Sequence, residues 1–217
     1  MGIVVVGDCT RALGDLARER WRRATGKTPR RSPPSAVDEV WPSGVASAAM
    51  DVDVAIARTE PAFAGREAVA EVRMLHEDAI AAARRFIYAE NQYFTSHAIA
   101  EAFAARLGEA RPPEIAVVSP YSQSGWLEIT TMGVLRSRIH RKLRAADRDG
   151  KYRLYCPILG WQKATEGCLN VHSKVLIVDD TLLTVGSSNL ADRSLSLDTE
   201  CHLVIEAGGT PRRRTLI

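Results

Sequence analysis

The sequence predicts an α/β fold in which a mixed β-sheet is flanked by helices on both faces. Two observations predict this fold class. Between about residues 51 and 155, short apolar segments alternate with helical patterns of ten or more residues, as in sheets covered by helices. After residue 170, three strand-like segments follow one another with short connections, which favours antiparallel neighbours in the same sheet.

The first fifty residues are expected to carry one helix and a long irregular connection. Residues 3–6 are apolar and predict a short buried strand. Thr10 is the expected N-cap of a helix that Gly26 ends. The apolar positions on one face of this helix are Leu13, Leu16, Ala17 and Trp21. Residues 27–50 contain four prolines and form no regular pattern.

The remaining elements follow from the spacing of apolar residues. Residues 51–58 alternate strictly between apolar and other positions, which is typical of a half-buried strand. The expected strands are 51–58, 86–89, 114–118, 152–155, 171–178, 181–185 and 199–205. The expected helices are 66–84, 97–108 and 127–146. We therefore divide the chain into residues 1–50, a main domain over 51–206, and a tail over 207–217.

The composition is that of an ordinary globular protein. Hydrophobic residues make up 46% of the 217 residues and charged residues 25%. No segment approaches the roughly 18–20 apolar residues that a membrane span needs. The amino-terminal residues lack the basic region of a signal peptide. We expect a soluble or peripheral membrane protein in the cytoplasm.

The cysteines do not predict a disulfide framework or a metal site. They lie without a repeated spacing at Cys9, Cys156, Cys168 and Cys201. A zinc site would have to combine Cys201 with His202, but neighbouring strand residues point to opposite faces. We expect reduced thiols, no metal and no cofactor.

The net charge of +3 is only mildly basic, but the positive residues are clustered. Solvated helix faces and tails are one interpretation of such clusters. The other is attraction to a phosphate-bearing partner such as an anionic lipid surface. The clustered residues are Arg18, Arg20, Arg22, Arg23, Lys27, Arg30 and Arg31, then Arg136, Arg138, Arg141, Lys142 and Arg144, and finally Arg212, Arg213 and Arg214.

One segment concentrates residues suited to phosphate chemistry. It reads His172-Ser173-Lys174 and continues to Asp179, followed by Gly186-Ser187-Ser188-Asn189. Residues two apart on a strand share a face, so His172 and Lys174 are expected side by side, about 6.5–7 Å apart. A hairpin through residues 179–180 would return Asn189 to the same place. Gly186 suits a backbone that bends or approaches a ligand closely.

These residue types fit a phosphodiester because its negative charge has to be neutralised before a nucleophile can attack. Lys174 and the amide of Asn189 are suitable donors to the nonbridging oxygens. Histidine can attack phosphorus or protonate a leaving alkoxide near neutral pH. His172 would then need a carboxylate on its other ring nitrogen. We expect Glu200 to provide it, from a strand beside 171–178.

These residues resemble the phospholipase D superfamily, whose signature is His-x-Lys-x4-Asp followed by Gly-Ser-x-Asn. The resemblance continues through Asp192-Arg193-Ser194 and Leu197-Asp198-Thr199-Glu200. Upstream, Ile87-Tyr88-Ala89-Glu90-Asn91-Gln92-Tyr93-Phe94 is similar to the segment that precedes the second motif in lipid-cleaving members. The resemblance therefore covers about residues 50 to 206.

The resemblance implies roles for individual residues. His172 is similar to the second-motif histidine, which acts as general acid and base. Lys174 and Asn189 are similar to the phosphate-binding pair, and Glu200 to the acid that orients a catalytic histidine. Asp179 is expected to hold structure.

Four further positions are expected to support the site. Asn91 and Gln92 would either help to shape it or serve a structural turn. Gly186 and Ser187 belong to the second part of the signature.

The sequence departs from the family in one respect: lipid-cleaving members carry two such motifs, and this chain has one. His76, His97, His140 and His202 have no lysine two residues later. The segment 15–21 resembles the end of the family's first half, so residues 1–50 would be its remnant plus a linker. We interpret the chain as a C-terminal half, whether a fragment, a split gene or one partner of an assembly.

The leading hypothesis is a phosphodiesterase or phosphatidyltransferase that acts on phospholipids at a membrane surface through a phosphohistidine. A second His-Lys pair would come from another chain or a homodimer. One rival is a homodimeric nuclease with a single motif per chain, although the segment 87–94 makes a nucleic-acid substrate the weaker choice. A second rival is an inactive remnant that binds lipid phosphate.

Overall fold

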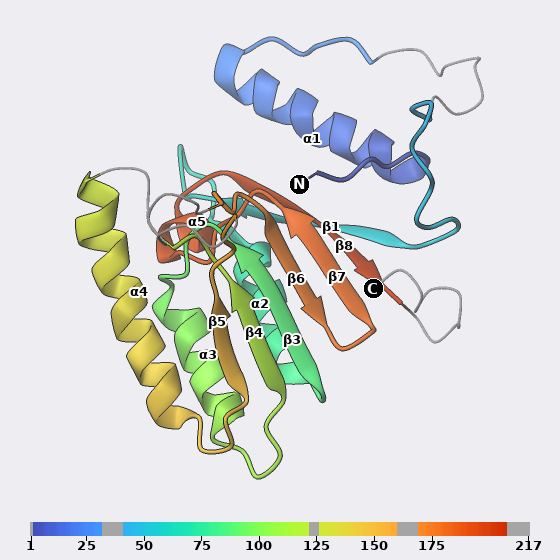
Figure 1. Cartoon of the computed structure of the whole chain (residues 1–217). Helices are drawn as coiled ribbons and strands as arrows, with labels where there is room; N and C mark the ends of the chain where they lie inside the picture. Colours follow the sequence, from blue (N-terminus) through green and yellow to red (C-terminus); the bar gives the residue numbers. More distant parts are fainter. Residues whose placement is uncertain (1, 32–40, 122–125, 160–168, 208–217) are drawn as a thin grey trace.

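The structure, a computed structural model, describes residues 2–31, 41–121, 126–159 and 169–207 (Figure 1). Among these residues, eight strands form one sheet in the order β2-β1-β8-β7-β6-β3-β4-β5. The strands are β1 (Val54–Glu60), β2 (Val69–Ala70), β3 (Phe86–Asn91), β4 (Glu114–Val118), β5 (Tyr152–Tyr155), β6 (Lys174–Val178), β7 (Leu182–Gly186) and β8 (Glu200–Glu206). The helices are α1 (Asp8–Thr25), α2 (Glu71–Ala82), α3 (His97–Leu107), α4 (Trp126–Ala146) and α5 (Asp192–Ser196).

The sheet is mixed, as the sequence predicts. β3, β4 and β5 run parallel, and helices α3 and α4 make the crossovers between them. From β3 through β6, β7, β8 and β1 to β2, every pair is antiparallel. The change from parallel to antiparallel pairing falls at β3, which has β4 on one side and β6 on the other.

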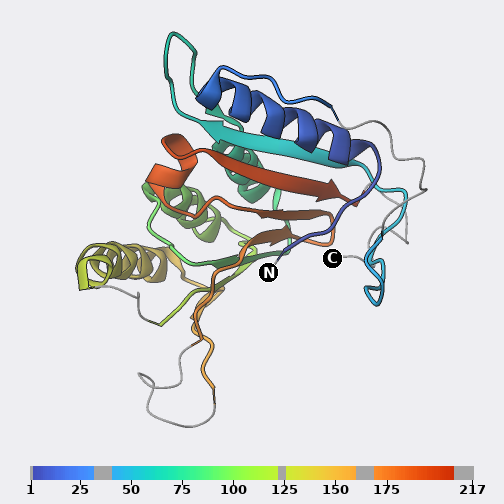
Figure 2. The same cartoon turned by 90° about the horizontal axis from the view of Figure 1, so that it is seen from above.

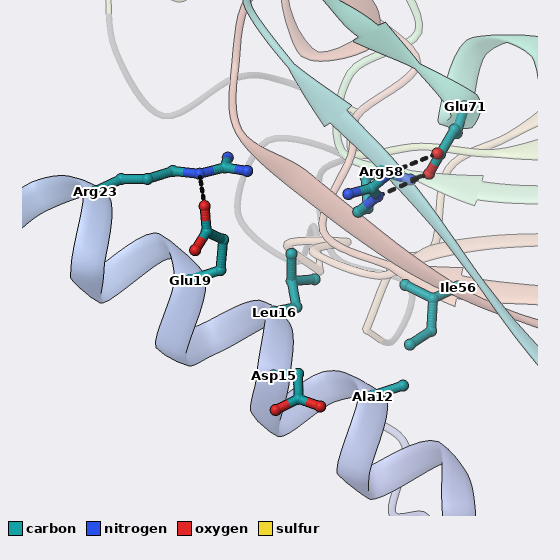
Figure 3. Close-up of a pocket in the computed structure, with 8 residues that line it drawn as sticks. All are labelled: Ala12, Asp15, Leu16, Glu19, Arg23, Ile56, Arg58 and Glu71. Carbon is teal, nitrogen blue, oxygen red and sulfur yellow. Dashed lines mark hydrogen bonds and ion pairs between the residues drawn. The ribbon is translucent and has the colours of Figure 1, made fainter. Parts of the chain in front are cut away.

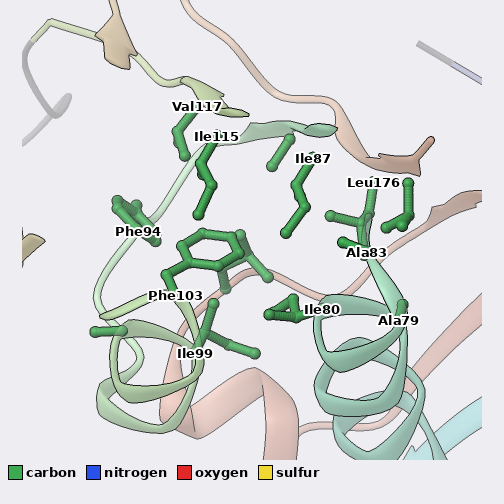
Figure 4. Packing of buried hydrophobic residues seen from close by; sticks show 14 of the residues in the cluster. Ala79, Ile80, Ala83, Ile87, Phe94, Ile99, Phe103, Ile115, Val117 and Leu176 are labelled. Atoms are coloured by element: carbon green, nitrogen blue, oxygen red, sulfur yellow. The ribbon is translucent and has the colours of Figure 1, made fainter. Parts of the chain in front are cut away.

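One face of the sheet carries the hydrophobic core. α2 and α3 pack there, and α4 packs beside α3 at the β5 edge (Figures 1 and 4). Figure 4 shows Phe103 of α3 and Ile80 of α2 pointing towards Ile87, Ile115 and other strand residues. The largest fully buried apolar side chains are Tyr152, Phe94, Phe103, Ile80, Ile87, Ile99, Leu107, Ile115, Leu143, Leu176 and Leu195.

The strand register decides which other residues share this helix-covered face. Ala89 of the core pairs with Leu176, and two residues further along Asn91 pairs with Lys174. On the next strands, Gly186 pairs with His202, and His202 pairs with the core residue Ala57. Since directly opposite residues project to the same side, Lys174 and His202 both lie on the helix-covered face.

Helix α1 lies against the other face at β1 (Figure 2) and joins the domain through polar contacts. None of its residues is buried. Arg23 forms an ion pair with Glu60 of β1, and Arg20 donates to the carbonyl oxygen of Glu200 at 3.1 Å. Arg18 and Arg22 pair with acids of their own helix, Asp15 and Glu19. The amino-terminal cluster of arginines is therefore largely committed to internal pairs.

Three expectations for the amino-terminal third are wrong. Residues 2–7 form no strand, and residues 2–4 are exposed. α1 begins at Asp8 after Gly7, and the hydroxyl of Thr10 donates to the Gly7 carbonyl oxygen at 2.6 Å instead of capping the helix. The helix expected from residue 66 starts at Glu71, because residues 69–70 pair with the end of β1 as β2.

Most later boundaries agree with the sequence to within one to three residues. The strand 114–118 is observed at the expected bounds, and α1 ends at Gly26 in the left-handed conformation that favours glycine. The short helix α5 was not anticipated. Within the described part of the chain, no helix is both long and apolar enough to cross a bilayer. The expected tail beyond residue 207 lies outside the described residues.

We predict that the core under α3 dominates stability. Phe103 is 0% exposed and Phe63 is 70% exposed. Phe103→Ala should lower the free energy of unfolding by about 3–5 kcal/mol, because a buried ring is lost and a cavity remains. Phe63→Ala, the matched control, should change it by less than about 0.5 kcal/mol. Urea denaturation followed by circular dichroism measures both, and equal losses would contradict this account of the core.

Candidate functional site

The signature residues meet at one end of the sheet, where β3 ends, β6 begins and β7 ends. The β6–β7 hairpin pairs Val175 with Val185, so the chain returns to the level of Lys174 at Gly186. Asn91, the last residue of β3, lies opposite Lys174, the first residue of β6. Residues 187–190 then pass beside Asn91. The predicted hairpin is confirmed.

Lys174 is the buried cation of this site. Its side chain is held by two acceptors: the ammonium donates to Gln92 Oε1 at 3.1 Å and to the backbone carbonyl oxygen of His172 at 2.9 Å. Lys174 is only 6% exposed. Burial lowers the pKa of Lys174, and the negative charge of Glu200 acts in the opposite direction. Glu200 is thus near enough to influence the ammonium without forming an ion pair.

His172 lies just before the strand and is exposed. β6 starts at Lys174, so the expected strand over 171–178 is three residues too long at its beginning. Of the two residues, only Lys174 lies on the strand, so the expected shared strand face is not formed. The Lys174 ammonium is nevertheless close to the backbone of His172, because it donates a hydrogen bond to the His172 carbonyl oxygen. Among the described residues, none hydrogen bonds to the His172 ring.

Asn189 lies in the segment 188–190, whose backbone is hydrogen bonded to the side chain of Asn91. The amide of Asn91 accepts from the Leu190 N–H at 3.0 Å and donates to the Ser188 carbonyl at 3.5 Å. Asn91 is buried, so its side chain serves the backbone of the segment 188–190. The Oδ1 atom of Asn189 is buried and has no hydrogen-bond partner among the described residues.

Glu200 is buried at the start of β8, but its surroundings differ from the expectation. The strand expected beside 171–178 is β8, yet β7 lies between β6 and β8. The carboxylate accepts a hydrogen bond from the hydroxyl of Ser187. The same hydroxyl accepts from the Cys201 N–H at 3.0 Å. No hydrogen bond joins Glu200 to His172 in the described part of the chain, so its orienting role stays a prediction.

A glycine is required at position 186 because the ring of His202 occupies the space that a Cβ atom would need. A Cβ atom at this position would lie 2.3 Å from Cδ2 of His202 and 2.5 Å from the Cys201 carbonyl oxygen. The close approach expected at Gly186 is therefore made to the ring of His202. His202 is 1% exposed, and its Nε2 atom accepts a hydrogen bond from the Ser188 N–H at 3.1 Å. The residues near His202 in the sequence do not predict this contact.

Asp179 performs a structural task at the other end of β6. Its carboxylate accepts hydrogen bonds from the backbone N–H groups of Arg84, Arg85 and Phe86 at 2.9, 2.8 and 3.0 Å. Burial alone would raise the pKa of Asp179, but these three donors outweigh it and the pKa is lowered. Asp179 thus fastens the β6–β7 turn to the beginning of β3.

Glu90 of β3 contacts Ser173, the residue just before β6, on the face opposite the hydrophobic core. Its carboxylate accepts from the hydroxyl of Tyr88 and from that of Ser173, each at 2.5 Å. Burial, followed by the neighbouring Glu90, raises the pKa of Tyr88 to about 12. Ser173 lies between His172 and Lys174, so this contact fixes the backbone that carries both.

The structure gives no support to a metal site in the part of the chain that it describes. No group of three His, Cys, Asp or Glu side chains is arranged to hold an ion there. Cys9 and Cys201 are free thiols, and Cys168 lies outside the described residues. Cys201 and His202 project to opposite sides of β8, as expected from their adjacency.

A hollow between α1 and β1 is separate from the signature residues (Figure 3). Figure 3 shows its charged side chains engaged with one another, Arg23 with Glu19 and Arg58 with Glu71. Because these charged groups already pair with one another, few of their donors and acceptors are left to bind a ligand. The residues that line it are Ala12, Asp15, Leu16, Glu19, Arg23, Ile56, Arg58 and Glu71.

Comparison with known proteins identifies the family. The model of the family described as "Cardiolipin synthase, PLD-like domain" matches residues 77–210, more than half of the chain. The chain therefore belongs to this phospholipase D-like family, and the resemblance stated from its motifs is confirmed.

Individual relatives are more distant. Phospholipase D zeta 2 of Arabidopsis thaliana is 28% identical over 163 residues, which span 57% of this chain and 16% of that protein. Phosphatidylserine synthase of Haemophilus influenzae Rd KW20 has a similar fold, with a TM-score of 0.54 and 16% identity, over 99% of this chain and 45% of that one. Nuc from Salmonella typhimurium gives a TM-score of 0.48 and 18% identity, over 72% of this chain and 84% of that one.

We predict that the Asp179 carboxylate stabilises the fold in a pH-dependent manner. Asp179→Asn should lower the free energy of unfolding at pH 7 by about 1–3 kcal/mol, because an amide cannot accept all three N–H groups as a carboxylate does. Since the folded pKa lies below the ordinary value of 3.8, the contribution is complete above that value. It is lost as the pH falls through the folded pKa.

Asp180→Asn is the matched control for this experiment. Asp180 is adjacent but pairs with Arg85 at the surface, so its replacement should cost less than about 1 kcal/mol. Urea titrations at pH 7 and below pH 3 measure both variants. A difference between wild type and Asp179→Asn that stayed the same at both pH values would count against the carboxylate as its cause.

Proposed function

We propose that this chain supplies one half of a phospholipase D-type active site, which hydrolyses or transfers phosphatidyl groups. Family membership supports the reaction class. The observation that carries the proposal is the hydrogen bond from the Lys174 ammonium to the His172 backbone, beside the segment that presents Asn189. The Lys174 ammonium, the segment that carries Asn189 and the backbone of His172 therefore lie at one end of the sheet. In the proposal the His172 imidazole turns to the same place, where an anionic phosphodiester can be neutralised.

In the proposed reaction, two histidines divide the work. A nitrogen of the first attacks phosphorus, so an N–P bond forms and the P–O bond to the head group breaks. His172 donates its proton to the departing alkoxide oxygen. Water or another alcohol then attacks phosphorus, His172 takes its proton, and the N–P bond breaks. Lys174 and Asn189 hold the nonbridging oxygens, whose negative charge the transition state redistributes.

The first histidine has to come from outside these 217 residues. The signature occurs once here, and the remaining histidines have no lysine two residues later. A second chain could supply the other half, or two copies could pair so that the two His172 residues share both roles. The match to phospholipase D zeta 2 of Arabidopsis thaliana spans 16% of that protein. We propose that the chain acts as a C-terminal half built from residues 51–206.

A phospholipid is the proposed substrate, met at a membrane surface. The segment 87–94 is similar to that of lipid-cleaving members, and the matching family carries the name of cardiolipin synthase. Its residues lie in the site itself: Asn91 grips the segment 188–190 and Gln92 accepts from Lys174. The proposed chemistry requires neither metal nor cofactor, because lysine and asparagine supply the charge stabilisation.

We predict that turnover depends on His172 and on assembly. His172→Ala should reduce head-group release from phosphatidylcholine vesicles by about 10²–10⁴-fold, the usual contribution of general acid–base catalysis. His97→Ala, which removes another exposed imidazole at the start of α3, should leave the rate unchanged. Head-group release is measured across protein concentrations, alone and with a chain that carries the other motif, while light scattering reports the oligomeric state.

Three results would contradict the proposal, each in a different way. Equal specific activity of dilute monomer and assembled protein would show that no second half is needed. Cleavage of single-stranded DNA in place of phospholipid would identify a nuclease. Activity unchanged in His172→Ala would leave a phosphate-binding remnant as the better description.

A further inference from the structure

We propose that His202 is a positioning residue that sets the place of the Asn189 amide by accepting the Ser188 N–H. This inference rests on the proposed function, because it assigns a task towards the same phosphate site. Asn189 itself has one residue on each side held by a buried side chain. Asn91 holds the Leu190 N–H at 3.0 Å, and His202 holds the Ser188 N–H at 3.1 Å. Asn189 projects between these two anchors.

The ring of His202 is held at β7 and borders α2. Thr184 of β7 lies within hydrogen-bond reach of Nδ1, with Oγ1 at 3.4 Å. His76 of α2 meets the ring edge to face, with the ring centres 5.3 Å apart. Gly186 leaves the space that the ring occupies, since a Cβ atom there would collide with it. The ring therefore packs directly against the end of β7, beside Ser188.

The hydrogen bonds also assign the tautomer of the ring. Because Nε2 accepts from a backbone N–H, it carries no proton, and the single proton of the neutral ring lies on Nδ1. Among the described residues, the neighbours of the ring on β1, β7 and α2 are Ala57, Thr184 and His76, none of which is an acid. Burial, with a smaller contribution from His76, lowers the pKa of His202 to about 3. The ring thus stays an acceptor at neutral pH.

His76 offers a matched contrast. It is equally buried, but its Nδ1 donates to the carbonyl oxygen of Val72 in its own helix at 2.7 Å. Removing His76 takes away a buried ring beside His202 and leaves the Ser188 N–H with its acceptor. Removing His202 takes away both a buried ring and that acceptor. A purely structural role would make the two substitutions alike.

The test combines a titration with inorganic phosphate and nitrogen-15 NMR of the full chain. His202→Leu should weaken phosphate binding about tenfold, the effect of losing one buried hydrogen bond. His202→Gln should recover most of the affinity, because its amide oxygen can accept the Ser188 N–H. His76→Leu should also lower the melting temperature, though less than His202→Leu because the Ser188 N–H keeps its acceptor, and should leave phosphate affinity unchanged. In the wild type, the His202 ring should show a protonated Nδ1 and a bare Nε2 at pH 7.

Several outcomes would overturn the inference. They are phosphate affinity retained in His202→Leu, an equal loss in His76→Leu, or a wild-type ring with its proton on Nε2. The tautomer measurement needs no substitution, so it decides even if His202→Leu does not fold. Failure of the wild type to bind phosphate would count against the proposed function instead. The Asn189 side-chain amide signals then decide the inference: His202→Leu must shift them and His76→Leu must not.

Discussion

The pairing of β3 with β6 is the constraint on which the rest of the site depends. At one end of this ladder, Asp179 holds the backbone of residues 84–86 with its carboxylate. At the other end, Asn91 holds the segment 188–190. These contacts at both ends fix the register of β6. A shift of one residue, which they prevent, would turn every side chain of β6 to the opposite face. Lys174 can then project from the strand end only towards the site.

Much of the fold could be predicted because its elements are local. The spacing of apolar residues and the flanking residues that end regular structure predict the strand 114–118 and the helix that begins at residue 97. β2 could not be predicted, because residues 69–70 continue a helical pattern and form a strand only through pairing with β1. Strand order is likewise a property of the whole chain. Placing β8 beside β6 was wrong because nothing local reveals that β7 lies between them.

The site divides in the same way. The residue types and spacing of the signature led to Lys174, Asn189 and their neighbourhood from the sequence alone. His202 did not stand out, because its acceptor role depends on Ser188, fourteen residues away and brought near by the β7–β8 pairing. The sequence points to both Glu200 and Ser187 but does not predict the hydrogen bond between them, since a hydroxyl beside a motif has many local uses. Sequence patterns thus found the proposed phosphate-binding groups better than the residues that support them.

The antiparallel partnership of β1 and β8 bears on how the domain can be cut from its surroundings. The match to the family model begins at residue 77, after β1 has ended. Yet β1 pairs with β8 along six residues, from Val54 with Ile205 to Thr59 with Glu200. Trimming the chain to residues 77–210 would remove β1 and leave β8, the strand of Glu200 and His202, as an unpaired edge strand. An unpaired edge strand can pair with strands of other molecules and cause aggregation. We therefore expect the shortest autonomous unit to include β1 and to start at or before residue 54.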